Sequence, residues 1–585
     1  MAAGQGGGRP ARSFTVFRFF FAATAVAAVV LGCIGFRAYV RTRPEFGSDP
    51  FDLLYYSLQL FVLSSAPLDK GGPLPAALEI ARYAAPLATA YAVAETVRVL
   101  GADEIRRVRV ARRRGHAVVC GSGQPALLLA ERLRAAGTAV VVVAAARQDG
   151  DTFLSVAGDA RRPAVLRAAG AHRASVLYAC EDGSGDNVLI ASAAQQLARR
   201  PGEPLRVYAS VDDPDLCSAL RARHLAGGGR SGIRLDFFNV DEAAARLLAE
   251  RERIEGNDPA RPPCVLIVGQ TPFARSLLAE LARRWRLLGP SAAKLPVILV
   301  GPTAASVVEV LVRRYEFLPE VCHFTSRDVP DAELDVNALL APAASGGPLP
   351  RPDRVYICRD ADDLSLTTAL TAVRLWNGPP GSLTVRLAQQ GPFGRALGHD
   401  DGDLLDDLGG RLRVFGVTDA ACTPELIGDD LVEQLARAFH DAYVLARSGR
   451  GDCLHTNAAM VPWEQLPDTL RRANRAAAAH VGAKLRAIGC ALAPRADAAV
   501  AFALRDDEVE TLAKMEHLRW MEERTADGWV HGPARDDAAR IHPDLQSWER
   551  LPETVREKDR DAVRDVPGIL ASAGFQVIRL VQSGR

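Results

Sequence analysis

The sequence lacks the cysteine patterns that mark metal-bound or disulfide-linked proteins. Its ten cysteines are scattered singly from Cys33 to Cys490, without a Cys-x-x-Cys pair or a Cys/His cluster at metal-ligand spacing. Such scattering is typical of a reducing compartment. We therefore predict no structural zinc and no other metal site.

The chain also lacks an excess of charge of either sign. Its 71 basic and 70 acidic residues leave a net charge of +1, which gives no general reason to expect nucleic-acid binding. With 48% hydrophobic residues the composition suits a folded protein, and 585 residues predict about three to five structural units. Arginine far outnumbers lysine, which is typical of GC-rich bacterial genomes.

One long apolar run stands near the amino end. The segment from Phe19 to Phe36 is uncharged, and Arg18 and Arg37 bracket it. A helix of that length spans roughly 27 Å, close to the thickness of a bilayer core. A signal peptide is the alternative, but the run is long for one and no small-residue cleavage site follows it. We predict a cytoplasmic tail over residues 1–13 and a transmembrane helix over 14–40.

A second transmembrane helix is predicted over residues 74–100. It contains Glu79, Arg82, Glu95 and Pro86, so it needs a protein partner or a watery lining. Arginines precede the first helix and fill the basic linker 101–114 after the second. Under the positive-inside rule both termini then lie in the cytoplasm, and the segment 41–73 lies outside.

Part of this outer segment resembles the re-entrant pore helix of two-helix potassium channels. The resemblance lies in Asp52-Leu-Leu-Tyr-Tyr-Ser57, which leads to Leu63, Ser64, Ser65 and Ala66 at the place of the selectivity filter. The glycines that allow the unusual dihedral angles of a potassium filter are missing here. The resemblance implies a pore that is not strictly potassium-selective, and a hairpin without a pore is the alternative.

A glycine motif follows the basic linker. Gly121-x-Gly123-x-x-Ala126 comes after the apolar strand 116–120 and opens an apolar helix. Free N–H groups at such a helix start favour a phosphate group. A dinucleotide site normally has an acidic residue after the second strand, but here the strand 140–143 leads to Arg147. Arg147 either holds a phosphate or is a solvated loop residue.

Residues 115–252 resemble the TrkA-N or RCK domain, the regulator of potassium conductance. The resemblance rests on the glycine motif together with Gly158-Asp159-Ala160 at the expected distance behind it. It implies a Rossmann-like α/β fold that binds a nucleotide or dinucleotide, NAD-like or adenine-based, as a regulatory ligand. The nominated residues are Gly121, Ser122, Gly123, Ala126, Asp159 and Arg147.

The strand–turn–helix pattern restarts at residue 263 after a linker over 253–262. The repeat covers 263–430, with further strands predicted at 297–300, 354–358 and 383–387. Thr271 takes the place of the second glycine, so we predict that this copy binds nucleotide weakly or not at all. Tandem RCK domains assemble into rings, and the resemblance implies a homotetramer.

The carboxy-terminal part is predicted as a helical connector over 431–500 and a mainly helical domain over 501–585. The stretch with Glu516-His517-Leu-Arg-Trp520, Asp527-Gly-Trp529 and His542-Pro543 is similar to the ryanodine-receptor repeat, or RyR domain. Aromatic faces hold rings and arginine holds phosphate, so a ligand pocket is one interpretation and a structural core with ion pairs is the other. The candidate pocket residues are Trp520, Trp529, Arg535, Asp536 and His542.

Taken together, the segments predict a ligand-gated ion channel in the bacterial cytoplasmic membrane, with a nucleotide-like ligand sensed by RCK and RyR domains. A membrane-anchored regulator without its own pore is the alternative. An NAD-dependent oxidoreductase is the weakest interpretation, because neither Rossmann half carries a Tyr-x-x-x-Lys pattern, a Cys/His pair or a following substrate domain. We predict no enzymatic activity.

Overall fold

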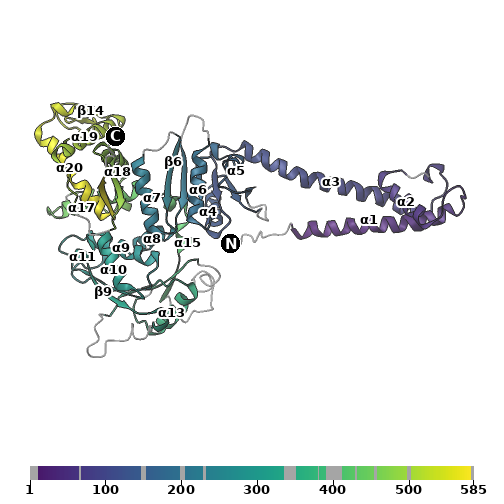
Figure 1. Ribbon diagram of the computed structural model, residues 1–585, viewed down its shortest axis with the longest axis horizontal. Coiled ribbons are helices and arrows are strands. Elements are labelled where there is room, and N and C mark those ends of the chain that lie inside the picture. The colour runs from purple at the N-terminus through teal and green to yellow at the C-terminus, as the bar shows by residue number, and fades with distance from the viewer. Residues whose placement is uncertain are drawn as a thin grey trace. The chain divides into compact units, whose positions relative to one another are not determined.

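The structure is a computed structural model in which the described residues are 11–64, 67–146, 153–197, 204–227, 232–334, 351–379, 381–389, 411–428, 431–452, 457–496 and 502–580. The chain divides into two compact units, Met1–Arg112 and Arg113–Arg585. Figure 1 shows the course of the chain, coloured from the N-terminus to the C-terminus. The division falls where the helix α3 ends.

All the secondary-structure elements in the described part of the first unit are helices. Its elements are α1 (Ala11–Val40), α2 (Pro50–Gln59), η1 (Leu60–Val62), η2 (Leu68–Lys70) and α3 (Ala76–Arg112). The long helices α1 and α3 pack against each other, and the short α2 lies against α1. α3 extends beyond the predicted span 74–100, so the basic stretch 101–114 is helical as far as Arg112.

Small residues on α1 allow its neighbours to approach closely. A Cβ atom on Gly35 would lie 2.6 Å from the backbone nitrogen of Leu78 on α3, and one on Gly32 would lie 2.8 Å from the Oγ of Ser57 on α2. Phe36 and Leu78 are fully buried at this junction. Close approach at small residues is a common way for apolar helices to associate.

Among the described residues, one helix is long and apolar enough to cross a membrane. It is Phe19–Val40, with a mean hydropathy of 2.3. Large apolar side chains are exposed on both long helices, for example Phe19 on α1 and Val93 on α3. Exposed large apolar side chains of this kind are typical of a lipid or protein contact.

The second unit begins with a parallel sheet of six strands in the order β3-β2-β1-β4-β5-β6. The strands are β1 (Ala117–Cys120), β2 (Val140–Ala144), β3 (Leu154–Ala157), β4 (Val176–Ala179), β5 (Leu205–Ser210) and β6 (Ile233–Phe238). The helices between and after them are α4 (Gln124–Ala135), α5 (Pro163–Ala168), α6 (Ser184–Gln195), α7 (Pro214–Gly227) and α8 (Val240–Glu252). This strand order is that of a Rossmann fold, as predicted.

A second parallel sheet repeats this arrangement in the order β12-β11-β10-β7-β8-β9. Its strands are β7 (Val265–Val268), β8 (Leu295–Gly301), β9 (Cys322–Asp328), β10 (Arg354–Ile357), β11 (Leu383–Leu387) and β12 (Leu412–Gly416). Its main helices are α9 (Pro272–Arg286), α10 (Ala304–Arg314), α13 (Asp362–Leu375), α15 (Val417–Ala421) and α16 (Pro424–Ile427). The internal repeat and its three further predicted strands are confirmed.

The carboxy-terminal part is mainly helical, with two small sheets. Its helices are α17 (Leu431–Ser448), α18 (Asp468–Ala487), α19 (Asp506–Ala526) and α20 (Glu553–Ser572). β13 (Cys490–Pro494) pairs antiparallel with β16 (Phe575–Arg579), so the predicted connector 431–500 contributes a strand that closes against the last strand of the chain. β14 (Val530–His531) and β15 (Ile541–His542) form the second small sheet.

α18 docks on the first Rossmann domain. A Cβ atom on Gly482 would lie 2.1 Å from the carbonyl oxygen of Leu225 in α7, so only glycine permits this approach. On its other side, α18 is linked to α19 by the buried Lys484, whose Nζ lies 2.6 Å from Glu516. α18 therefore contacts both the first Rossmann domain and the carboxy-terminal domain.

Candidate functional site

The glycine loop connects β1 to α4 by a turn that requires glycine. Gly121 has a φ of +134° and its N–H donates to Val143 at 2.9 Å. Ser122 is exposed, whereas Ala126 is fully buried where α4 packs on the sheet. Gly123 is the N-cap residue of α4 and makes no side-chain capping bond. The structure thus places three of the predicted residues in one turn at the carboxyl edge of the sheet, and Ala126 in the first turn of the helix that follows.

Carboxylates surround this turn. Asp182, just after β4, lies so close that a Cβ atom on Gly123 would be 2.8 Å from its Oδ1. Burial raises the pKa of the neighbouring Glu181, and the carboxylates of Asp182 and Asp186 raise it further. A ligand phosphate at the start of α4 must therefore displace the Asp182 carboxylate, or bind together with a cation that compensates the repulsion between the two anions.

Asp159 lies at the same edge, after β3, and is paired with arginine. Arg161 donates from its Nε to Asp159 at 2.9 Å and from its Nη1 to Asp186 at 2.9 Å. These hydrogen bonds lower the pKa of Asp159. Arg147 lies outside the described residues, so its predicted contact with a phosphate stays a prediction.

A cavity of about 230 Å³ lies beside the glycine loop, between the carboxyl edges of the two sheets. Its wall includes Pro125 and Asp182 from the first Rossmann domain and Arg386 from the second. Arg386 lies 3.7 Å from Asp241, and the buried Nε of Arg386 and Oδ1 of Asp241 have no hydrogen-bond partner among the described residues. Burial raises the pKa of Asp241, although Arg386 opposes that shift. The cavity therefore offers both a donor and an acceptor to a polar ligand.

In the second Rossmann domain, a side chain occupies the corresponding turn. Thr271 is 3% exposed and forms the N-cap of α9, where its Oγ1 accepts from the N–H of Ala274 at 3.2 Å. The threonine side chain occupies the helix start that a pyrophosphate would need. This geometry agrees with the expectation that the second copy binds nucleotide weakly or not at all.

In the carboxy-terminal domain, three of the five predicted pocket residues form an aromatic cluster. The ring of His542 on β15 lies 4.9 Å from that of Trp520 on α19 and 6.2 Å from that of Trp529, both edge-on. All three residues are half-buried. Accessible indole faces are typical binding surfaces for planar rings.

The arginine that completes this cluster is Arg524, which the sequence interpretation missed. Its guanidinium lies 5.0 Å from the ring of Trp529 and 6.0 Å from that of Trp520. Its buried Nε has no hydrogen-bond partner among the described residues. Arg524 lies four residues after Trp520 on the same helix, and this spacing is the sequence signal that would have indicated it.

The two other predicted pocket residues are engaged locally. Arg535 is exposed and forms an ion pair with Asp537 at 2.7 Å. Asp536 accepts from the N–H groups of Ala538 and Ala539 at 3.0 Å and so fixes the turn before β15. Arg535 is available to a ligand only in competition with Asp537.

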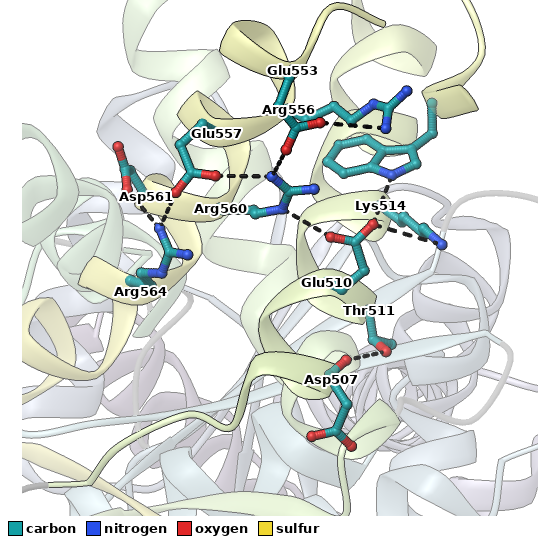
Figure 2. A network of polar contacts seen from close by, with 11 residues as sticks. Asp507, Glu510, Thr511, Lys514, Glu553, Arg556, Glu557, Arg560, Asp561 and Arg564 are labelled. Carbon is teal, nitrogen blue, oxygen red and sulfur yellow. Dashed lines mark hydrogen bonds and ion pairs between the residues drawn. The ribbon is translucent and has the colours of Figure 1, made fainter. Parts of the chain in front are cut away.

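A network of ion pairs holds α19 and α20 together (Figure 2). Arg560 on α20 contacts Glu510 on α19 at 2.8 Å and Glu557 at 2.8 Å, and the indole N–H of Trp548 donates to Glu510 at 3.0 Å. Trp548 is buried in the core of this domain. Trp548 and this network are structural, and neither includes a residue of the predicted pocket, so the two interpretations of that pocket both stay predictions.

The filter-like stretch is described only in part. Leu63 ends η1 with a φ of +58° and is exposed, and the N–H of Ser64 donates to Gln59 at 3.3 Å. Thr89 of α3 donates to the carbonyl of Phe61 at 3.0 Å and so fixes η1 against α3. Ser65 and Ala66 lie outside the described residues.

Within the described ranges, no three His, Cys, Asp or Glu side chains form a group that could hold a metal ion.

Two segments of the chain match known domain families. Residues 117–226 match the TrkA-N domain, and residues 504–579 match the RyR domain. These matches confirm the two domain resemblances, and they include the glycine loop with Asp159 and the aromatic cluster with Arg524. Comparison with curated proteins gives no match.

Solved structures with a partly similar chain path include three titled as GsuK. The one titled as bound to ADP has a TM-score of 0.36 and 15% identity, and the alignment covers 71% of this chain and 97% of that one. The one titled GsuK Channel has a TM-score of 0.38 at 14% identity, covering 70% and 97%. The one titled as bound to NAD has a TM-score of 0.36 at 12% identity, covering 86% and 91%.

Proposed function

We propose that the protein is a membrane channel whose pore is gated by a nucleotide-like ligand bound to its cytoplasmic domains. The observation that carries this proposal is the connection between α3 and the TrkA-N domain. α3 runs without a break to Arg112, and only residues 113–116 separate it from β1. A short link transmits a displacement, whereas a long flexible one would absorb it.

In this proposal α1 and α3 span the bilayer of the bacterial cytoplasmic membrane, with both termini in the cytoplasm. α2 and η1 then form the re-entrant segment, and Leu63, Ser64, Ser65 and Ala66 line its narrow part. Four copies of the chain surround the pore as a homotetramer. The absence of glycine from the filter-like stretch favours a pore that is not strictly potassium-selective.

Two places are proposed as ligand sites. The aromatic cluster takes the base of the ligand against Trp520 and Trp529, with Arg524 holding a phosphate. The glycine loop with Gly121, Ser122, Gly123, Ala126, Asp159 and Arg147 is the other site. Because Asp182 stands at the start of α4, we place the stronger binding at the aromatic cluster.

The experiment is ion flux through liposomes that contain the purified full-length protein. Potassium and sodium flux are recorded with and without ATP, ADP and NAD as probes. We expect at least one probe to change the flux severalfold, and Trp529→Ala to abolish that change while the protein stays folded by circular dichroism. Absence of flux with every probe would overturn the channel proposal.

A membrane-anchored regulator without its own pore is the second candidate. The observation that favours it is the left-handed Leu63 at the end of η1, where a potassium filter needs flexible glycine. The two candidates differ in one measurement. Binding of a probe to the purified protein, without flux under any condition, is the result expected for the regulator.

A further inference from the structure

A second cavity lies away from both proposed ligand sites, where α17 packs on the two Rossmann domains. Its volume is about 260 Å³. Residues of α7, α8, α9, α10 and α17 line it, together with Glu255, Tyr315, the segment 460–464, Ala573 and the start of β16. Ligand pockets for drug-sized molecules usually measure about 300 to 1,000 Å³, so this cavity suits a small metabolite and excludes a dinucleotide.

The positive and negative side chains of the cavity wall are equal in number. Five arginines and five carboxylates line the cavity. Several of them are paired: Arg284 contacts Glu255 at 3.1 Å and Glu464 at 3.0 Å. A balanced wall gives no attraction for a ligand with several negative charges, such as a nucleotide. It suits a ligand that carries one charge of each sign.

Some polar atoms of the wall are left without partners. Oε2 of Glu255 is buried and has no hydrogen-bond partner among the described residues, although Oε1 accepts from Arg284. Arg314 uses its terminal nitrogens for Asp215 and Ser218, but its buried Nε has no acceptor in the same part of the chain. A buried donor or acceptor without a partner costs about 1 to 3 kcal/mol, which a bound molecule with complementary groups would recover.

Asp441 on α17 is a further carboxylate of the wall. It makes no hydrogen bond or ion pair within 4.0 Å with any described residue. Burial raises its pKa to about 6, although Arg283 and Arg437 oppose that shift. A cationic group placed beside Asp441 would stabilise its charged form. The wall also contains the apolar faces of Trp463 and Tyr315.

We propose that this cavity binds a zwitterionic molecule of amino-acid size, with its ammonium group toward Glu255 and Asp441 and its carboxylate toward Arg314. The proposal is independent of ion conduction. It gives the protein a further binding site for a small molecule, at the junction of α17 with both Rossmann domains.

The test is thermal unfolding of the full-length protein in detergent with each proteinogenic L-amino acid at millimolar concentration. We expect at least one of them to raise the unfolding temperature in a saturable way, because a ligand that binds the native state stabilises it. The amide and the N-acetyl form of that amino acid, which each lack one charge, should bind at least tenfold more weakly. No shift with any amino acid, or equal binding of the blocked forms, would overturn the proposal.

Two kinds of variant locate the site. Asp441→Asn and Glu255→Gln should each weaken binding about tenfold, since an ion pair of about 1.4 kcal/mol corresponds to that factor. Ser276→Phe fills the cavity from α9 and should abolish binding, whereas Ser306→Phe on the exposed face of α10 is the control. Retained binding in Ser276→Phe, with the fold intact, would place the amino acid elsewhere and contradict the proposal.

Discussion

A Cβ atom on Gly121 would lie 2.4 Å from the carbonyl oxygen of Cys180, the residue that follows β4. The second Rossmann domain has the same relationship, because a Cβ atom on Gly269 would lie 2.1 Å from the carbonyl oxygen of Cys358 after β10. In both domains the first turn passes directly against the end of the fourth strand. This close approach, together with positive φ angles of +134° and +107°, makes glycine necessary before any ligand is considered.

Gly121→Ala and Gly269→Ala should each lower the free energy of unfolding by about 2 to 4 kcal/mol, because the added methyl group meets a backbone oxygen that cannot rotate away. Gly137→Ala is the matched control. Gly137 also has a positive φ, of +82°, but a Cβ atom there meets nothing within 4 Å, so its cost should be about 1 kcal/mol. Thermal and denaturant unfolding of the intact protein measures all three. Equal costs for Gly121→Ala and Gly137→Ala would show that the approach to Cys180 is unimportant.

The sequence predicted most of the two Rossmann domains, because buried parallel strands such as β2 and β8 are continuous apolar runs and glycine marks the turn after them. It did not predict that Asp182 stands beside Gly123. Those two residues are far apart in the sequence, and only the pairing of β1 with β4 brings them together. The same holds for β13 and β16, which are separated by the whole carboxy-terminal domain. Arg524 was not predicted, although it lies four residues after Trp520 and so on the same face of α19.

Arg524→Gln should weaken binding of ATP, ADP or NAD, whichever binds, by about ten- to a hundredfold, since an arginine–phosphate contact is a charge-assisted hydrogen bond. Arg535→Gln should change the affinity less than threefold, because Arg535 is already paired with Asp537. Isothermal titration calorimetry on the full-length protein compares the two variants. The reverse order of effects would assign the phosphate contact to Arg535.

Glu508 at the start of α19 is 3% exposed and ties α19 to β16. Hydrogen bonds from Arg579 lower its pKa to about 2, and a hydrogen bond from the backbone N–H of Arg505 at 2.9 Å adds to that shift. A lowered pKa contributes stability that is present above about pH 4.3, the ordinary pKa of glutamate, and is lost as the pH falls toward 2. Glu508→Gln should therefore cost about 2 kcal/mol at pH 7 and should flatten the loss of stability in acid.

The control for Glu508 is Glu522→Gln, on the exposed face of the same helix. It should leave the unfolding temperature unchanged from pH 7 to pH 3, as exposed charges contribute little. Unfolding is followed by tryptophan fluorescence, to which Trp520, Trp529 and Trp548 of this region contribute together with Trp285, Trp376 and Trp463 elsewhere. If the two variants behaved alike in acid, the ion pair with Arg579 would have no role in stability.

Glu433 and Asp441 lie on the same helix, α17, and their pKa values are shifted in opposite directions. Burial alone would raise the pKa of Glu433, but hydrogen bonds and charge from Arg475 lower it, whereas burial raises the pKa of Asp441 to about 6. The stability that Glu433 contributes is present above about pH 4.3 and lost below it. For Asp441 the folded protein favours the protonated form. The stability that this form contributes is present below about pH 3.9 and is lost as the pH rises through 6.

Asparagine resembles the protonated form of Asp441, so Asp441→Asn should stabilise the protein at pH 7.5 by about 1 to 3 kcal/mol, and this gain should vanish near pH 4. Glu433→Gln should do the opposite and destabilise the protein at pH 7.5 by about 1 to 2 kcal/mol, because it breaks the contact with Arg475. Denaturant unfolding at both pH values, without added amino acids, measures the two variants side by side. A loss of stability in Asp441→Asn at pH 7.5 would mean that its carboxylate has a partner in the native state, and that the cavity beside it is already filled.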